Sequence, residues 1–222
     1  MSLLAGASGF SFESWRPGFY PAGTRSADFL AFYSRQLPTV ELNSTFYRLP
    51  QAPQFERWAA PVPDGFRFAV KAPRRISVWG RLEEAPEFCA RVRALGDRLG
   101  PLLVRLHDDR KRDDGLLRGL LEGLDEDLWV AFDLRHPSWD GVEALLEGRA
   151  AVRVNQMESA APFRYLRLRE PPYDDVALRG WAQRLAPLLG EGIAVHCYFR
   201  HEAEPTAPAY AQRLLELTGE RA

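Results

Sequence analysis

The chain has 222 residues, of which 46% are hydrophobic, and its formal net charge at pH 7 is −1. This length and apolar content allow one sizeable hydrophobic core, and we expect a single domain over residues 1–222. The near-zero charge excludes a grossly basic nucleic-acid-binding protein, although it leaves room for a local basic patch.

Eight short apolar stretches have the composition of β-strands. They cover residues 2–7, 38–43, 66–71, 101–107, 128–135, 150–155, 163–169 and 193–199. The second stretch is the most informative, because the apolar side chains Val40 and Leu42 alternate with Glu41 and Asn43. It therefore predicts a strand with one apolar face and one polar face.

Helical patterns separate most of these strands. Ser26 should cap a helix over 27–37, and Pro86 should open a helix over 86–99. Further helices are expected around residues 55–58, 116–121, 142–146, 174–189 and 207–218. Regular alternation of strand and helix predicts a parallel sheet with right-handed crossovers, and eight such strands close naturally into a TIM-type barrel. Because residues 156–162 are too few for a crossover helix, the barrel should be irregular between its sixth and seventh strands.

Successive side chains of a strand point to opposite faces, so odd and even positions can be separated. One set is apolar in nearly every strand and should pack against the helices. The other set is polar and should point into the barrel, with its charges toward the strand carboxyl ends, where barrel active sites lie. The predicted inward cations are Lys71, Arg105, Arg135, Arg153, Arg167, Arg169 and Arg200, and the inward anions are Glu41 and Asp133.

This imbalance of charge bears on function. A buried unpaired charge is unfavourable by several kcal/mol, so lysine or arginine should bracket Glu41 and Asp133. The remaining cations favour an anionic ligand, such as a phosphate or a carboxylate. The alternative is an ion-pair network that only fills the barrel, and we favour the ligand site.

The loops that follow the strands contain aromatic residues mixed with arginine. Trp15, Tyr47, Trp79 and Trp139 are the ones that could face a ligand, whereas other loop aromatics should pin the loops to the barrel. Aromatic and cationic side chains at a cleft rim suit a ligand with a flat or sugar-like part and an anionic part, nucleotides included.

Several common signals are absent from the sequence. It has no phosphate-binding P-loop, no dinucleotide fingerprint and no Gly-x-Ser-x-Gly elbow. Glu41, Asp133, His107 and His196 could in principle share a metal, but the arginines around them would repel it, so we expect no metal site. Glu41 and Asp133 could also be an acid–base pair.

The sequence also bears on location. No apolar run approaches the length of a membrane span. The start of the chain lacks a charged leader followed by a long apolar region, so we expect a cytoplasmic protein without a signal peptide. Cys89 and Cys197 lie in apolar patterns, as expected of buried thiols in a reducing cytosol.

Several motifs together resemble one known family. They span residues 6–12, 15–21, 40–50, 66–73, 99–103 and 132–139. In their order and spacing the chain resembles the YecE-like family, catalogued as domain of unknown function 72. The resemblance implies a somewhat irregular TIM-type barrel with an inward polar cleft, and its likeness to the xylose-isomerase and apurinic-endonuclease barrels suggests nucleic-acid or phosphosugar binding. The site residues that it implies are Glu41, Asn43, Tyr47, Lys71, Asp133, Arg135, His136 and Trp139.

The chain departs from the family pattern in one half of the cleft. The departures are at 77–79, 105–107, 169–170 and 199–201. They indicate either a different ligand or a site that binds without catalysis.

Our first hypothesis is an enzyme acting on a phosphorylated or other anionic substrate at the carboxyl-terminal mouth of the barrel, with hydrolysis as a candidate reaction. Glu41, Asp133 and Lys71 are the expected catalytic residues, and Glu41 or Asp133 would be the general base. The expected ligand-binding residues are Asn43, Tyr47, Arg135, His136, Trp139, Arg167, His196 and Tyr198. The alternatives are a non-catalytic binder of nucleic acid or nucleotide, and a structural barrel with an inert interior. Cofactors and oligomeric state are left open, and no membrane partner is expected.

Overall fold

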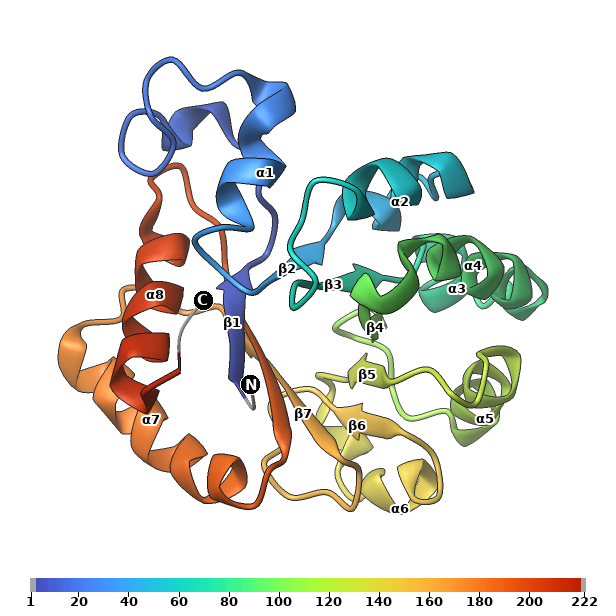
Figure 1. Ribbon diagram of the computed structural model, residues 1–222. Helices are drawn as coiled ribbons and strands as arrows, with labels where there is room; N and C mark the ends of the chain where they lie inside the picture. The colour runs from blue at the N-terminus through green and yellow to red at the C-terminus, as the bar shows by residue number, and fades with distance from the viewer. Residues whose placement is uncertain (1–2, 221–222) are drawn as a thin grey trace.

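The computed structural model describes residues 3–220, in which eight parallel strands surround a central axis and helices lie outside them (Figure 1). The strands are β1 Leu3–Ala7, β2 Thr39–Leu42, β3 Arg67–Lys71, β4 Leu99–Arg105, β5 Val130–Asp133, β6 Ala151–Arg153, β7 Phe163–Leu168 and β8 Ala194–Phe199. They hydrogen-bond in the order β6-β5-β4-β3-β2-β1-β8-β7. The predicted TIM-like α/β barrel is therefore confirmed; Ser2, where the first strand was expected to begin, and the very start of the chain lie outside the described residues.

The predicted irregularity between the sixth and seventh strands is also confirmed. Strands β6 and β7 are not paired, and their unsealed edge is called the seam here. Asn155 links its two sides: its backbone N donates to Tyr165 O at 2.9 Å, and its side-chain Oδ1 accepts from Arg167 N at 2.7 Å. Asn155 has φ 64, a left-handed conformation that asparagine tolerates better than most residues. Asn155 thus supplies hydrogen bonds to β7 at the place where β6 and β7 form no backbone ladder.

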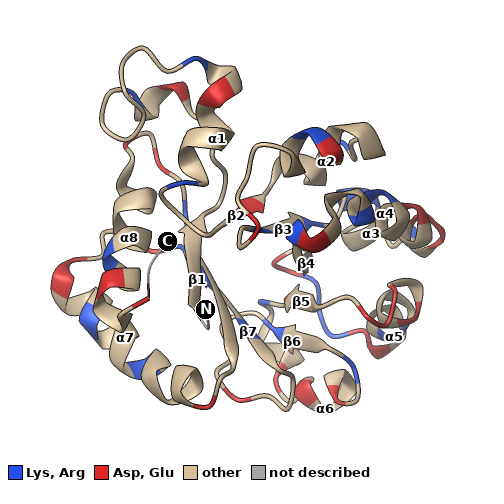
Figure 2. Cartoon of the chain, in the orientation of Figure 1, with Lys and Arg blue, Asp and Glu red and all other residues tan. Residues whose placement is uncertain are grey.

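Within residues 3–220, eight α-helices, several of them short, form the outer ring. They are α1 Phe29–Tyr33, α2 Ala52–Ala59, α3 Arg74–Ser77, α4 Ala85–Val92, α5 Asp114–Gly123, α6 Glu143–Leu146, α7 Asp175–Gly190 and α8 Thr206–Thr218. Aspartate caps two of them, because Asp113 accepts from Leu116 N at 2.9 Å and Asp174 accepts from Ala177 N at 2.8 Å. Both signs of charge occur on these helices (Figure 2). None of the described helices is long and apolar enough to cross a membrane.

Two predicted helices differ in detail. The helix expected over 86–99 ends as an α-helix at Val92 and continues as a 3-10 segment over Arg93–Arg98, within which Gly96 has φ 55 and interrupts the helical backbone. Strand β4 then begins at Leu99, two residues before the predicted start. Ser26 does not cap a long helix; it opens a short 3-10 turn, and its hydroxyl donates to the carboxylate of Glu13.

The apolar side chains form two cores, one on each face of the strands. The outer core packs the strands against the helices. A smaller inner core fills the barrel with Ala69, Leu103, Ala131, Val152, Ala161, Phe163, Tyr165 and Tyr198. The predicted parity holds in most strands, and Cys197 lies buried on the outer face as expected.

Strand β6 is the exception to the parity prediction. Its register sets Ala151 beside Val130 and Arg153 beside Phe132, so Val152 points inward. Arg153 points outward and pairs with Asp140 at 3.1 Å and with Glu143 at 3.5 Å. The prediction that Arg153 is an inward cation is therefore wrong. Arg200, beyond the end of β8, is exposed.

Candidate functional site

Charged side chains from five strands meet at the carboxyl end of the barrel. We call them the mouth cluster: Glu41, Lys71, Arg105, Asp133, Arg135, Arg167 and Arg169. Their convergence follows from the fold, because parallel strands all end on the same side and alternate residues of each strand face the axis.

Arg167 connects the two carboxylates of this cluster. Its Nε and Nη2 donate to Glu41 Oε2 and Oε1, both at 2.9 Å, and its Nη1 donates to Asp133 Oδ2 at 2.6 Å. All three side chains are almost fully buried. The flat guanidinium fork suits such two-sided pairing, which a lysine could not provide.

Glu41 is surrounded by donors. In addition to Arg167, its Oε1 accepts from Asn43 Nδ2 at 2.9 Å and its Oε2 accepts from Tyr165 Oη at 2.9 Å. Burial alone would raise the pKa of Glu41, but the charge of Arg167 and these hydrogen bonds outweigh it and hold the pKa below its ordinary value. Glu41 is therefore an ionised carboxylate with both oxygens occupied.

Asp133 is held ionised in the same way. Arg135 Nε donates to Asp133 Oδ1 at 3.0 Å, and Arg135 Nη2 donates to Oδ2 at 3.3 Å. Burial opposes ionisation, yet the charges and hydrogen bonds of Arg167 and Arg135 prevail and lower the pKa of Asp133. The prediction that basic residues bracket Glu41 and Asp133 is confirmed.

Lys71 has a different environment. Only 7% of the residue is exposed, and its Nζ lies 4.0 Å from the centre of the Phe46 ring. No carboxylate among residues 3–220 lies within ion-pair distance of it. Burial and the positive charge of Arg167 lower the pKa of Lys71 to about 8, although Glu41 opposes the shift. The amine is therefore buried and cationic, and it has no counter-ion in the described part of the chain.

Two further arginines complete the excess of positive charge. Arg169 makes no side-chain ion pair or hydrogen bond within the described part of the chain, and burial followed by repulsion from Arg167 lowers its pKa. Arg105 pairs with Asp108 at the rim at 2.8 Å, while its buried Nε lies 3.8 Å from Asp133 and has no hydrogen-bond partner. Both side chains retain donors for a further acceptor.

A cavity of about 580 Å³ opens beside the seam and reaches this cluster. Asp133, Arg135, Asn155, Arg167 and Arg169 are among the residues that line it. The missing β6–β7 ladder thus leaves a lateral approach to the charged side chains. Its volume lies in the range that small-molecule sites occupy.

A serine–histidine contact, which sequence reasoning missed, lies beside the mouth. Ser8 Oγ accepts from His201 N at 3.1 Å and lies 3.2 Å from His201 Nδ1, and the imidazole stacks on Phe12. Burial first, and then the charges of Arg169 and Arg200, lower the pKa of His201. Tyr165 was not predicted either, although it alternates with Arg167 on the same strand and with Arg169 just beyond it, and therefore shares their inward face.

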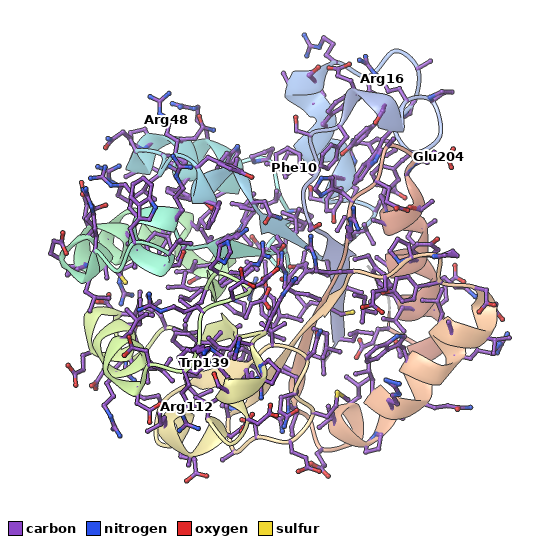
Figure 3. All side chains as sticks on the ribbon, turned by 180° about the vertical axis from the view of Figure 1, so that it is seen from behind. Phe10, Arg16, Arg48, Arg112, Trp139 and Glu204 are labelled. Atoms are coloured by element: carbon purple, nitrogen blue, oxygen red, sulfur yellow. The ribbon has the colours of Figure 1, made fainter. Side chains whose placement is uncertain are left out.

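The structure brings six of the eleven predicted site residues together, namely Glu41, Asn43, Lys71, Asp133, Arg135 and Arg167. Three others lie in loops. Tyr47 is 75% exposed, and the imidazole of His136 accepts from Ser138 N at 3.1 Å, capping the 3-10 turn η6 Pro137–Trp139. Trp139 is fully buried and its Nε1 donates to Arg110 O at 2.8 Å, so it anchors that turn to the neighbouring loop (Figure 3).

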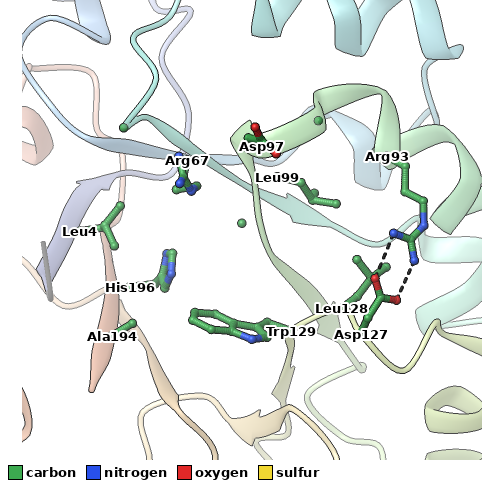
Figure 4. A pocket seen from close by; sticks show the side chains of 13 residues that line it. Leu4, Arg67, Arg93, Asp97, Leu99, Asp127, Leu128, Trp129, Ala194 and His196 are labelled. Carbon is green, nitrogen blue, oxygen red and sulfur yellow. Dashed lines mark hydrogen bonds and ion pairs between the residues drawn. The ribbon is translucent and has the colours of Figure 1, made fainter. Parts of the chain in front are cut away.

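The last two predicted residues lie deeper in the barrel. Tyr198 Oη is 2.8 Å from Thr39 Oγ1 and 3.2 Å from His196 Nδ1. His196 lines a separate cavity at the amino-terminal end of the strands (Figure 4). No group of three or more His, Cys, Asp or Glu side chains within residues 3–220 is arranged to hold a metal ion.

Comparisons with known proteins agree with this architecture. The model of the family described as protein of unknown function DUF72 matches residues 4–222. The chain is 42% identical over 53 residues to the UPF0759 protein YunF of Bacillus subtilis, a match that covers 24% of this chain and 19% of that protein. Two solved DUF72 family structures share its fold. One, from Thermotoga maritima, has a TM-score of 0.80 at 21% identity and covers 99% of this chain and 100% of its own. The other, from Enterococcus faecalis, has a TM-score of 0.81 at 18% identity, and the alignment covers 99% of this chain and 96% of the Enterococcus chain.

Proposed function

This chain belongs to the DUF72 family of proteins of unknown function, and we propose that it is an enzyme acting on a small substrate whose phosphate or carboxylate group binds at the mouth cluster. One observation carries the proposal. Lys71 is buried and Arg169 is half-buried, yet neither has a counter-ion within the described residues. Because a charge withdrawn from water without compensation is costly, a site that keeps both cations favours an anion.

The two carboxylates of the cluster do not offset this excess. Glu41 and Asp133 already form ion pairs with Arg167 and Arg135, so their negative charge is compensated within the network. Lys71, Arg169 and the unsatisfied Nε of Arg105 remain as donors. A ligand oxyanion would supply the acceptors that these groups lack.

The same geometry supports Lys71 as the group that transfers a proton. A catalytic acid or base works best when its pKa lies near the working pH, and the pKa of Lys71 is lowered to about 8. Glu41 and Asp133 are less suited to that role, because their pKa values are lowered and their oxygens are occupied. In our proposal these carboxylates hold Arg167 and Arg135 in place, and Arg169, which pairs with no carboxylate of the described residues, stabilises negative charge on the substrate.

Binding of sulfate and of small phosphate esters, measured by calorimetry at low salt, tests the proposal. Lys71→Met and Arg169→Met should each weaken binding at least tenfold. The matched control is Arg179→Met, because Arg179 is an exposed arginine of α7 whose ion-pair partner among the described residues is Asp175 alone. Equal affinity in all four proteins, or no anion binding by the wild type, would refute an anion site. Turnover of an ester that binds should be lost in Lys71→Met; turnover that persists would refute the catalytic role alone.

A non-catalytic role in nucleic-acid binding is the second candidate, and an exposed aromatic surface favours it. Trp79 is 54% exposed, and the guanidinium groups of Arg74 and Arg81 lie 4.9 and 5.9 Å from its ring centre. Exposed aromatic and cationic side chains of this kind can stack with bases and contact phosphates. A single-stranded oligonucleotide should then bind with an affinity that falls steeply with salt and that Trp79→Ala weakens. Absence of binding at low salt eliminates this candidate.

A further inference from the structure

A second cavity lies at the opposite end of the barrel from the mouth cluster. It has a volume of about 610 Å³ and is lined by residues at or just before the starts of strands (Figure 4). Leu4, Arg67, Leu99, Trp129 and His196 are the lining residues that matter here. Its volume is typical of a small-molecule site, and nothing in the proposed function uses it.

His196 is the polar group at the bottom of this cavity. It is 2% exposed, and its Nδ1 faces Tyr198 Oη at 3.2 Å, whereas its Nε2 has no hydrogen-bond partner among residues 3–220. Burial, reinforced by the charge of Arg67, lowers the pKa of His196 to about 3. The imidazole is therefore neutral at physiological pH and holds one proton.

A chain of hydrogen bonds determines which nitrogen carries that proton. Thr39 Oγ1 donates its only proton to Arg67 O at 2.7 Å, so Tyr198 Oη must be the donor in its 2.8 Å contact with Thr39 Oγ1. The Tyr198 oxygen can then only accept from His196, which places the imidazole proton on Nδ1. His196 Nε2 consequently presents a lone pair to the cavity and requires a donor from whatever binds there.

Arg67 contributes a positive charge to the same cavity. Its Nη1 donates to the carbonyls of Asp64 and Phe66 at 2.9 and 3.0 Å, and no carboxylate in the described part of the chain lies within ion-pair distance of it. Within residues 3–220 its Nε and Nη2 make no hydrogen bond, so one edge of the guanidinium remains available. A planar carboxylate matches such an edge.

Trp129 provides a flat wall. Its ring stacks on Phe163 with centroids 4.7 Å apart and planes inclined by 8°, and His196 meets it nearly at a right angle. Leu4, Leu99 and Leu128 add apolar surface. Aromatic rings bind such walls by offset stacking or edge contact.

We propose that this cavity binds a small aromatic carboxylate that bears an O–H or N–H donor. The carboxylate binds the free edge of Arg67, the ring lies against Trp129, and the donor bonds His196 Nε2. All three groups are required, so the site discriminates among close analogues.

Calorimetry with three matched probes tests the proposal on the whole chain. 4-Hydroxybenzoate should bind, whereas 4-hydroxybenzamide, which lacks the charge, and 4-methoxybenzoate, which lacks the donor, should each bind at least tenfold more weakly. This comparison uses only the wild type and so does not depend on any variant folding. Equal affinity for the three probes, or no binding of 4-hydroxybenzoate, would overturn the assignment.

Variants then locate the site. With sulfate present to occupy the mouth cluster, Arg67→Met and His196→Phe should each reduce 4-hydroxybenzoate affinity at least tenfold, while Lys71→Met at the opposite end of the barrel should leave it unchanged. Loss of affinity in Lys71→Met with retention in Arg67→Met would place the probe at the mouth cluster and reject the inference. Because the sulfate experiment reports on Lys71 and Arg169, failure of either proposal is recognised independently of the other.

Discussion

Arg167 on β7 and Glu41 on β2 are joined by two hydrogen bonds of 2.9 Å across the inside of the barrel, and the remaining terminal nitrogen of Arg167 bonds Asp133 on β5 at 2.6 Å. Three strands that are not neighbours in the sheet are thus connected through one buried guanidinium. The network also fixes which charges of the mouth cluster are already satisfied and which are left for a ligand.

Arg167→Met should destabilise the fold strongly. The substitution keeps much of the side-chain volume but leaves Glu41 buried with no cation, and breaking a buried pair in this way costs about 3–5 kcal/mol. Urea unfolding followed by circular dichroism measures the loss. Arg179→Met removes an exposed pair with Asp175 and should cost no more than about 1 kcal/mol. Equal losses in the two variants would show that the buried network contributes nothing particular to stability.

Lys71→Met should have the opposite effect on stability. Keeping a charged amine away from water destabilises the native state. The thioether should therefore raise the free energy of unfolding at pH 7 by about 1–3 kcal/mol while weakening sulfate binding at least tenfold. The gain should shrink as pH rises from about 8 to 10.5, because the native amine loses its proton before the unfolded one does. Lys111→Met, at an exposed position, is the control and should change neither property. A destabilised Lys71→Met protein would contradict the view that Lys71 is retained for function.

Affinity for sulfate should itself depend on pH. The amine of Lys71 is charged below its pKa of about 8 and neutral above it, so affinity should be constant near pH 6–7 and fall as pH rises through about 8. Sulfate is the appropriate probe because it does not titrate in this range. Lys71→Arg keeps a fixed positive charge and should remove the pH dependence. A wild-type affinity that is flat to pH 10 would remove Lys71 from the site.

Much of the mouth cluster could be predicted from sequence, because strand geometry alone fixes which alternate residues share a face. Glu41, Lys71, Asp133, Arg135 and Arg167 follow from that rule. Arg153 does not, because β6 has three residues and both Ala151 and Val152 are apolar, so the local pattern does not reveal its register.

Depth and loop conformation could not be predicted in the same way. His196 shares the inward parity of Tyr198 but lies nearer the start of its strand, and parity says nothing about position along the barrel axis. Trp139 follows β5 closely in sequence, yet the η6 turn directs it into the outer core. Periodic patterns end where strands end, so residues in the loops carry no comparable signal.

Gly6→Ala should weaken the contact between β1 and β2. A Cβ at Gly6 would lie 2.0 Å from Thr39 O and 3.0 Å from Tyr33 Oη, which itself donates to Thr39 O. The strands would have to separate, at a cost of about 3 kcal/mol. Gly23→Ala, where no atom lies within 4 Å of the added Cβ, is the matched control and should be nearly neutral in thermal unfolding. If both variants melted alike, the close approach of β1 and β2 would not be a constraint on residue 6.

His196→Gln should flatten the loss of stability on acidification. The pKa of His196 is lowered from 6.5 to about 3 by burial and by the charge of Arg67, so between these values the unfolded chain binds a proton that the native protein does not. The free energy of unfolding of the wild type should therefore fall with decreasing pH, by up to about 1.4 kcal/mol per pH unit from this residue alone. Carboxylates such as Glu41 and Asp133, whose pKa values are lowered, add a further loss at more acidic pH in both proteins.

The difference between the two proteins should thus be confined to the window from about pH 6 to pH 4.5. There the free energy of unfolding, measured with urea, should depend on pH less steeply in the variant, by an amount that corresponds to the uptake of about one proton. His107→Gln, which replaces an exposed histidine, is the matched control variant. Identical slopes for His196→Gln and the wild type would mean that His196 takes up its proton in the folded state. Its Nε2 would then be a donor rather than the lone-pair acceptor that the amino-terminal cavity requires.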